Sequence, residues 1–537
     1  MTALLILIPV LLLTLSSLGI AILRQTRPSI GYAWLWAVLA ALASAGLVLA
    51  LRWQVPLEVT IHQWEPFDRS SLVLDFILDR VSWPYAFALS AVLVAVLLTD
   101  SARLQSDAGP LTWIFSLLIT GLGMLAILAG GPVTLILTWT AIDLAELVGV
   151  FSTRVGRWMS QPMIISFAVR VTGTLLVMAA LLLSAAWGIE FAFTPIPSRL
   201  AVIMLLAAGL RLGVLPLNLP FIREVYSWRG LGNLVRLVGP ASSLVVLGRM
   251  PVDAVPAEWQ TVFLFFSALA ALYGSAMWLA ANPAQNARVY WVIALAGLAV
   301  ASVARGSAHS SLAWGCALLL TGSVLFLYSA QNRPVSVISL IAVIGVTGLP
   351  FTPAAHGWEG VIGPAFDLYS LAFILAVFML CLGFVRRALV AREELYRMER
   401  WIHTIYPAGL VILILSQWVI VLAGWREGFF SVGVWWASAL VVLPAILSGL
   451  LIHARQSAFS AEAVDRNWLG AFARRVGSGL AAFFRLNWLY GFLAWVYELA
   501  EDFIQLLTAM FEGDGGVLWT VVLLVLLISL LSSGGTP

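Results

Sequence analysis

The chain is a succession of long apolar runs divided by short polar segments. About sixteen runs reach roughly 18–22 residues, the length of a helix that crosses the hydrocarbon layer of a bilayer. Because that layer offers the backbone no hydrogen-bonding partner, each run is expected to form a helix that satisfies its own amide groups. The predicted spans are 2–23, 31–51, 81–99, 111–130, 132–152, 163–186, 200–217, 231–249, 259–281, 289–304, 309–330, 335–350, 361–385, 404–424, 432–452 and 516–533.

One stretch near the C-terminus departs from this pattern. Between residues 453 and 512, apolar residues recur mostly at spacings of three and four, with arginines such as Arg474 and Arg475 between them. This spacing is typical of an amphipathic helix that lies along the membrane surface. The predicted organisation is N-terminal transmembrane helices (1–110), a first repeat (111–249), a second, inverted repeat (259–385), C-terminal transmembrane helices (386–452), an amphipathic lateral helix (453–512) and a terminal span (516–533).

Two of the apolar runs end in a proline-rich interruption, GVLPLNLP at 213–220 and GVTGLPFTP at 345–353. Proline removes a backbone donor and clashes with the preceding turn, so each interruption is expected to break or end its helix. The two breaks fall near opposite faces of the predicted bundle, as in inverted repeats that enclose a transport path. Prolines at ordinary helix ends are the alternative interpretation. The break prolines are Pro216, Pro220, Pro350 and Pro353.

Arginines concentrate in alternate loops, and the positive-inside rule converts this bias into an orientation. It predicts a multi-pass protein of the cell's inner (plasma) membrane, embedded in the lipid bilayer, with its N-terminus outside. The first run lacks a preceding basic stretch and a small-residue cleavage signal, so it is expected to be retained. The arginines predicted to face inward include Arg24, Arg27, Arg103, Arg154, Arg223, Arg288 and Arg333.

Composition excludes several classes of protein. Hydrophobic residues make up 62% and charged residues 10% of the 537 positions, which excludes a soluble globular protein. Cys316 and Cys381 are too few for an iron–sulfur cluster, which needs about four ligands. No Cys/His cluster has the spacing of a zinc site. We therefore expect no cofactor and no metal, and the net charge of +3 gives no reason to expect a nucleic-acid partner.

All 29 of the Lys+Arg residues are arginines. A guanidinium keeps its proton at physiological pH, whereas a desolvated lysine can lose it. Any proton transfer inside the membrane would therefore depend on carboxylates, histidines and water. His309 and His356 fall at the outer ends of predicted spans and are interpreted as residues of the membrane interface.

Several ionisable residues fall inside predicted spans, where charge is costly and indicates function. Asp143 and Glu146 are three residues apart and share one face of their helix. One hypothesis is a proton-accepting pair, because two neighbouring carboxyls resist ionising together. The other is a fixed ion pair with Arg211 or Arg170 that only joins helices. The remaining ionisable residues assigned to spans are Arg236 and Asp367.

The order of these features resembles the antiporter-like membrane subunits of respiratory complex I, which are similar to the large subunits of multisubunit cation/proton antiporters. Residues 71–89 (SLVLDFILDRVSWPYAFAL) resemble the family's stretch leading into its third helix. In GLRLGVLPLNLPF (209–221), Arg211, Pro216 and Asn218 stand at the lysine, proline and histidine of the family's Lys-x-x-x-x-Pro-x-His run.

The second half and the C-terminal region resemble the same family. NARVYWVIALAG (286–297) resembles a helix that the family opens with a Lys-Arg pair, and GLPFTP (348–353) resembles its second helix break. The amphipathic stretch resembles the lateral helix of the largest such subunit. The sequence departs from the family where its central lysines would fall, near Ala241 and Ser323, because neither residue titrates.

The resemblance implies an all-α, polytopic membrane bundle of about 16 transmembrane helices, with two inverted five-helix repeats and a C-terminal lateral helix. It also implies other membrane subunits of a multisubunit complex as partners, and any redox centre would belong to those partners. If ions move, Asp143 and Glu146 would accept protons in the inner half, with Arg211 as their electrostatic modulator. Asp367 or Glu359 would be the acceptor of the outer half.

Three functions remain open at this point. The leading one is a membrane subunit of a complex I-like or antiporter-like assembly involved in proton or cation translocation, with conduction that is retained or degenerate. The alternative is a non-conducting subunit that braces its neighbours, which the missing lysines favour. A third is a lipid-linked sugar transferase with acids in its first outer loop, here Glu58, Glu65 and Asp68.

Overall fold

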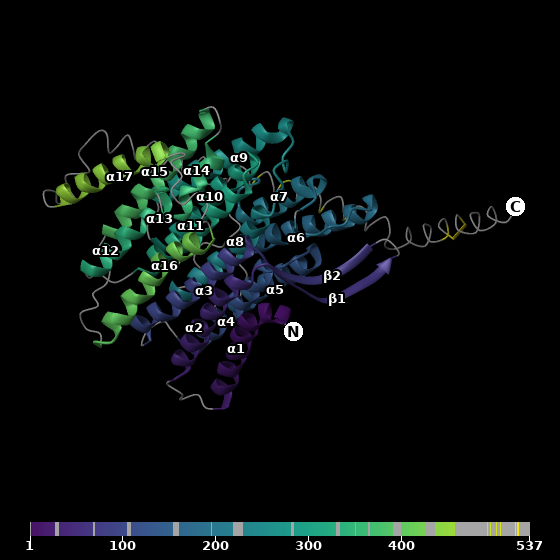
Figure 1. Ribbon diagram of the computed structural model, residues 1–537, viewed down its shortest axis with the longest axis horizontal. Helices are drawn as coiled ribbons and strands as arrows, with labels where there is room; N and C mark the ends of the chain where they lie inside the picture. The colour runs from purple at the N-terminus through teal and green to yellow at the C-terminus, as the bar shows by residue number, and fades with distance from the viewer. Residues whose placement is uncertain are drawn as a thin grey trace. The chain divides into compact units, whose positions relative to one another are not determined.

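A computed structural model gives the fold (Figure 1). The predicted breaks at Pro220 and Pro350 lie outside the residues it describes, and so do nearly all of 453–512 and 516–533. Contacts divide the chain into two units, Met1–Ser460 and Ala461–Pro537, and the helices and strands named below all belong to the first. The described residues are 2–26, 32–67, 70–104, 109–153, 161–194, 196–218, 229–280, 284–328, 333–349, 351–362, 366–389, 399–424, 435–456 and the single positions 491, 495, 501, 505, 521, 524 and 525.

Helices dominate this unit, and they follow the predicted spans closely. They are α1 (Ile8–Thr26), α2 (Ala33–Leu51), α3 (Ser82–Thr99), α4 (Pro110–Ile127), α5 (Pro132–Thr153), α6 (Gln161–Trp187), α7 (Ser198–Leu212), α8 (Arg229–Gly248), α9 (Ala257–Ala280), α10 (Ala284–Ala304), α11 (Ala308–Leu327), α12 (Arg333–Ala342), α13 (Ile344–Thr347), α14 (Gly357–Val361), α15 (Leu368–Leu389), α16 (Ile402–Gly424) and α17 (Trp435–Gln456), with short 3-10 helices η1 (Thr2–Leu7), η2 (Arg52–Gln54), η3 (Asp100–Arg103) and η4 (Pro353–Ala355).

The described helices confirm a polytopic membrane fold. Twelve of them are long and apolar enough to cross a bilayer, counting only the residues that the structure describes. The predicted spans at 200–217, 335–350 and 432–452 also coincide with helices: α7 is shorter than expected, α12 and α13 share one interrupted span, and α17 is apolar over Trp435–Pro444. Every predicted span before residue 453 therefore corresponds to a helix or to such an interrupted pair.

A β-hairpin occupies a segment that was expected to be a loop. Strand β1 (Leu57–Phe67) pairs antiparallel with β2 (Ser70–Leu78), and Leu57 lies opposite Leu78. Alternating apolar residues in LEVTIHQW and SLVLDFIL supply the period of two that a half-buried strand requires. The prediction of a loop was wrong because it rested on the long apolar runs and not on this shorter period.

The hairpin is joined to the ends of several helices. The amide of Ile77 donates to the carbonyl of Leu128 over 2.7 Å, and that of Gly130 donates to Asp75 over 3.1 Å. Arg249, at the end of α8, pairs with Asp79 over 3.4 Å. Burial raises the pKa of Asp79, but Arg249 and the hydrogen bonds from the start of α3 lower it further, so it lies below its usual value. We call this end of the bundle the hairpin side and the opposite end the far side.

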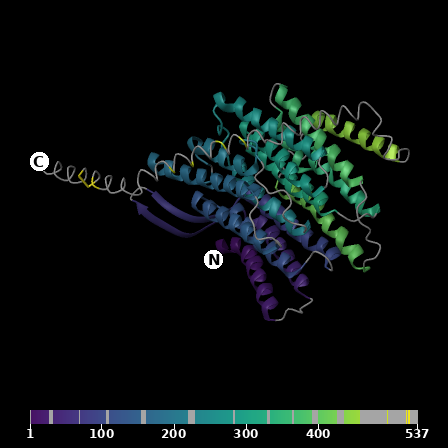
Figure 2. The same cartoon turned by 180° about the vertical axis from the view of Figure 1, so that it is seen from behind.

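Helices α8, α10 and α11 form the centre of the unit. The apolar windows of α10 and α11 are entirely buried, whereas only 28% of the window in α6 is buried. In Figures 1 and 2, α1 and α2 lie at one flank, and α12, α15 and α17 lie at the other. Close approach depends on small residues, because a Cβ at Gly274 of α9 would lie 2.6 Å from the amide nitrogen of Ala294.

The far-side end of α11 is capped by arginines from neighbouring helices. Arg103 donates to the carbonyl of Leu327 and Arg288 to that of Phe326, each over 3.3 Å, while Arg229 donates to Tyr328 over 3.2 Å. The last carbonyls of a helix have no partner within it and carry its negative dipole end. These arginines, of which Arg103 and Arg288 are buried and Arg229 is half-buried, therefore satisfy carbonyl groups that have no partner within α11.

Both predicted interruptions fall where helices end in a left-handed glycine. Helix α7 ends at Leu212, Gly213 has φ 81°, and Pro216 lies in the following turn. Helix α13 ends at Thr347, and Gly348 has φ 77°. Glycine adopts this conformation without the steric cost that a Cβ would add. Helix α7 starts from the hairpin side and α12 from the far side, so the two run in opposite directions along the bundle.

Candidate functional site

Four oppositely charged side chains meet inside the first half of the bundle. Asp143 and Glu146 come from α5, Arg170 from α6 and Arg211 from α7. Arg211 binds Asp143 through two bonds, Nη1 to Oδ2 over 2.8 Å and Nη2 to Oδ1 over 3.0 Å. Arg170 Nη1 pairs with Glu146 Oε2 and lies 3.4 Å from Asp143 Oδ1. We call these four residues the charge cluster.

The charge cluster is almost completely shielded from solvent. Exposed fractions are 2% for Asp143 and Arg211, 3% for Arg170 and 6% for Glu146. Two carboxylates and two guanidiniums carry no net charge when all are ionised. Balanced charges of this kind tolerate burial, because each ion is held by an opposite charge and by hydrogen bonds. The structure thus brings these four residues into contact. The sequence had left two hypotheses open for them, a proton-accepting pair and a fixed ion pair.

Helix packing fixes the position of Arg211. A Cβ at Gly173 of α6 would lie 2.6 Å from Cγ of Arg211 and 3.1 Å from the carbonyl oxygen of Ala207, so only glycine lets the arginine pass. Arg211 Nη1 also donates to the carbonyl of Arg170 over 2.9 Å and to Thr174 Oγ1 over 3.1 Å. Neighbouring turns of α6 therefore aim the guanidinium at α5.

An aromatic ring and two unpaired polar atoms complete the surroundings. The guanidinium carbon of Arg211 lies 4.3 Å from the centre of the Trp139 ring, a cation–π distance. Within the described residues, Nε of Arg211 and Nε1 of Trp139 are buried without a hydrogen-bond partner. Buried polar atoms of this kind are commonly satisfied by ordered water. The cluster is therefore suited to contact with internal water.

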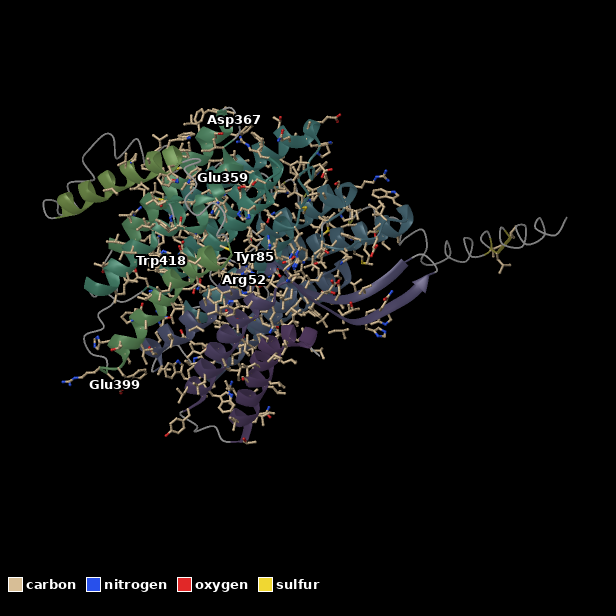
Figure 3. All side chains as sticks on the ribbon, viewed as in Figure 1. Arg52, Tyr85, Glu359, Asp367, Glu399 and Trp418 are labelled. Carbon is tan, nitrogen blue, oxygen red and sulfur yellow. The ribbon has the colours of Figure 1, made fainter. Side chains whose placement is uncertain are left out.

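Asp367 and Glu359 lie elsewhere, at the hairpin side of the second half. Figure 3 shows both near one end of the bundle, opposite Glu399. Asp367 was assigned to the interior of a span, but α15 begins one residue later, at Leu368. Its side chain is 39% exposed and pairs with Arg305 over 2.6 Å. Oδ1 of Asp367 accepts a bond from the amide of Ser370 over 2.8 Å, so Asp367 caps the N-terminus of α15.

Glu359 is exposed on the short helix α14. The structure therefore separates the predicted ion-pathway residues into two groups. Asp143, Glu146 and Arg211 form one buried network in the first half, and Asp367 and Glu359 lie at the hairpin side of the second.

Neutral polar residues occupy the centre of the bundle between these groups. Ser323, near the position of a family lysine, accepts a bond from Asn233 Nδ2 of α8 over 3.3 Å. Gln417 of α16 donates to Thr321 over 3.1 Å. Ala241, near the position of the other lysine, is fully buried. Sequence reasoning did not single out Asn233 or Gln417, because one polar residue in an apolar run has no distinctive spacing.

The structure also bears on cofactors and metals. In the part of the chain that it describes, no three His, Cys, Asp or Glu side chains are grouped so that they could hold a metal ion. Cys316 and Cys381 are buried on α11 and α15.

Comparison with known proteins gives matches among solved structures alone. No family model and no curated protein matches the chain. A chain of the Mrp complex from Dietzia sp. DQ12-45-1b gives a TM-score of 0.68 at 15% identity, over 99% of this chain and 63% of that one. A chain of the membrane-bound sulfane sulfur reductase, an archaeal respiratory membrane complex, gives 0.68 at 14% identity, over 97% and 100%.

A chain of respiratory complex I from Thermus thermophilus gives a TM-score of 0.59 at 18% identity, over 82% of this chain and 99% of that one. The chain has the fold of an antiporter-like membrane subunit. The predicted resemblance is thus confirmed at the level of the fold, since identities this low carry no more than that. The chain spans 63% of the length of the Mrp chain that it matches.

Proposed function

We propose that this chain is a membrane subunit of a complex I-like or multisubunit antiporter-like assembly, and that it takes part in moving protons or another cation across the membrane. The observation that supports this proposal most is the charge cluster, which is buried beside the glycine-ended helix α7 in this particular fold. Ionisable groups are kept inside a membrane bundle at a cost, and broken helices accompany transport paths.

The two acids of the cluster differ in how firmly they are held. Asp143 is bound by both terminal nitrogens of Arg211, the strong bidentate form of such a pair. Glu146 is bound by Arg170, which also lies 3.4 Å from Asp143. A proton that arrives on Glu146 would break its ion pair and leave Arg170 with Asp143. Loss of that proton restores the original arrangement, so Glu146 is the exchanging acid and Arg170 the side chain that responds.

The proposal includes a location and partners. The chain lies in the cell's plasma membrane with its N-terminus and hairpin outside, as the distribution of arginines favours. Other membrane subunits of the assembly bind it, and its redox or energy-supplying chemistry belongs to those subunits. The two glycine-ended helices, α7 and α12–α13, support an inverted arrangement of two halves around the path.

Flux measurements on the intact assembly in proteoliposomes test the cluster. Neutralising an acid alone would leave a buried arginine without its counter-charge, so each acid is removed together with its partner. The variants are Asp143→Asn with Arg211→Gln, and Glu146→Gln with Arg170→Gln. We expect proton uptake to fall at least ~10-fold, and most in the second variant, because general acid–base groups contribute about 10²–10⁴-fold. Glu258→Gln, on an exposed residue of α9, is the matched control.

A non-conducting, bracing subunit is the second candidate. It is favoured by the same ion pairs, which join α5, α6 and α7, and by the neutral residues at Ser323 and Ala241. Equal uptake in the wild type and in both charge-balanced variants would eliminate the proposed path. Loss of neighbouring subunits from those variants during purification would then favour bracing.

A further inference from the structure

A group of ionisable residues that the proposed function does not use lies at the hairpin side. His356 follows η4 at the hairpin side and is 6% exposed, so neighbouring parts of the protein cover its side chain. Its ring centre lies 5.6 Å from that of His309, an exposed residue at the start of α11. The negative charge of Glu359 acts on His356 from α14. One buried imidazole therefore lies between two exposed ionisable groups.

The backbone around His356 is held firmly against α11. Ser310 Oγ donates to the carbonyl of His356 over 2.8 Å, and Trp314 Nε1 donates to that of Gly357 over 3.0 Å. A Cβ at Gly360 would lie 2.5 Å from Cβ of Ser310, so α14 approaches α11 as closely as glycine permits. These contacts keep the imidazole at a fixed place beside the broken helix.

The groups facing His356 can be named for each element around it. Helix α11 contributes His309, α14 contributes Glu359, and Arg305 of the α10–α11 connection pairs with Asp367 nearby, donating also to the carbonyl of Val361 in α14. Helix α13 has no ionisable residue, and the histidine of α16 lies at its far-side start. Among the described residues, the ionisable groups that contact or act on His356 are therefore His309 and Glu359.

Asp367 is poorly suited to accept a proton near neutrality. Burial raises its pKa, but hydrogen bonds from Ser370 and the charge of Arg305 lower it more, so the pKa lies below its usual value. The pKa of His356 is lowered from 6.5 by burial, and Glu359 opposes that shift. His356 is thus neutral at pH 7 and gains a proton as the neighbouring aqueous phase becomes acidic.

Two buried hydroxyl groups lie beside the first two turns of α11. The hydroxyl of Tyr85, from α3, occupies the space that a side chain at Gly315 would fill. Within the described residues, the hydroxyls of Tyr85 and Ser311 are buried and have no hydrogen-bond partner. Ser311 and Gly315 share one face of the helix, about 6 Å apart along its axis. Buried groups of this kind call for ordered water.

We propose that His356, assisted by His309 and Glu359, is a proton-exchange site at the hairpin side of the second half, and that the buried hydroxyls of Ser311 and Tyr85 continue it into the bundle. The inference rests on the proposed function. It makes His356, instead of Asp367, the proton acceptor of the outer half. The imidazole takes a proton from water on one side and returns it to water on the other, so no co-reactant is required.

The test uses the intact assembly in proteoliposomes, with the pH of the hairpin-side compartment varied from about 5 to 8 around the histidine range. We expect His356→Gln to reduce proton flux at least ~10-fold and to flatten its dependence on that pH. Tyr85→Phe, which removes the hydroxyl alone, should reduce flux without altering the pH profile. His403→Gln, at the far-side start of α16, is the matched control and should behave as the wild type.

The outcomes separate this inference from the proposed function. If the charge-balanced cluster variants lose flux while His356→Gln keeps both its flux and its pH profile, the histidine site is overturned and the function stands. A wild-type assembly without flux overturns the proposed function. Histidine NMR of the same assembly then decides the site: a His356 signal that does not titrate between about pH 5 and 8 overturns proton binding as well.

Discussion

At the scale of single residues, arginine differs from lysine in its ability to take part in proton transfer. A lysine can release its proton when desolvated, whereas the guanidinium of Arg211 keeps its charge and fixes Asp143 through two parallel bonds. Arg211 is therefore a constant element of the charge cluster. In the proposed path the exchanging acid is therefore Glu146, to which a single nitrogen of Arg170 donates.

This role of Arg211 makes a prediction for stability. We expect Arg211→Gln to lower the free energy of unfolding by about 3–5 kcal/mol, because it leaves Asp143 buried without its cation. Adding Asp143→Asn should restore most of the loss, since the unpaired charge is then gone. Thermal unfolding of the purified protein in detergent measures both. Equal destabilisation of the single and double variants would show that the pair itself does not set the stability of this site.

At the scale of elements, close contacts between helices place the functional side chains. Helix α6 has glycine at the point where Arg211 crosses it, and α11 has glycine where the Tyr85 hydroxyl enters. Both positions are ordinary small residues in an apolar run, so their importance is visible only from the neighbouring helix. The hairpin adds a second kind of contact, because it binds the ends of α4 and α8 through backbone and ionic bonds.

The approach of α6 to α7 can be tested at Gly173. A methyl group there would meet the stem of Arg211 at 2.6 Å and the Ala207 carbonyl at 3.1 Å. We expect Gly173→Ala to lower the free energy of unfolding by about 1–3 kcal/mol through overpacking. Proton uptake should fall as well, because the clash displaces Arg211. Gly46→Ala in α2 is the control, because nothing lies within 4 Å of its added methyl group. For Gly46→Ala we expect the free energy of unfolding to rise by about 0.4–1 kcal/mol. A similar loss of stability in both variants would rule out the proposed clash.

At the scale of the whole molecule, the described unit combines a tightly packed centre with apolar flanks. Helices α10 and α11 have no exposed part in their apolar windows, whereas α1 and α6 present most of theirs outward. The centre is therefore packed against other parts of the chain, and the flanks leave apolar side chains exposed. The charge cluster is formed by α5, α6 and α7, whereas the His356 site lies between α13 and α14 beside the start of α11.

The orientation of this bundle in the membrane gives a prediction at the same scale. Tyr32 is 78% exposed at the far side and Val252 is 82% exposed at the hairpin side. In cells, a membrane-impermeant thiol reagent should label Val252→Cys but not Tyr32→Cys, because the hairpin side is proposed to face outward. Both native cysteines are buried, so we expect no labelling of the wild-type protein by the reagent. The opposite labelling pattern would reverse the orientation.

Much of the fold could be predicted because lipid imposes a simple rule on the sequence. A run of about 20 apolar residues has to form a helix, so the helices before residue 453 could be located from hydropathy alone. Helix ends were less accessible: α15 begins at Leu368, after Asp367, because a side-chain cap decides the boundary. The hairpin was missed because two short amphipathic strands depend on their mutual pairing.

For the site, the sequence by itself determined that Asp143, Glu146, Arg170 and Arg211 fall within apolar runs and that none of the cations is a lysine. It could not decide their partners, because Asp143, Glu146, Arg170 and Arg211 come from three helices whose rotation and depth are set by packing. It also could not show that His356 is buried beside His309, since the connection after α13 folds back onto α11. Hydropathy fixes where helices cross the membrane, and only tertiary packing fixes which side chains they bring together.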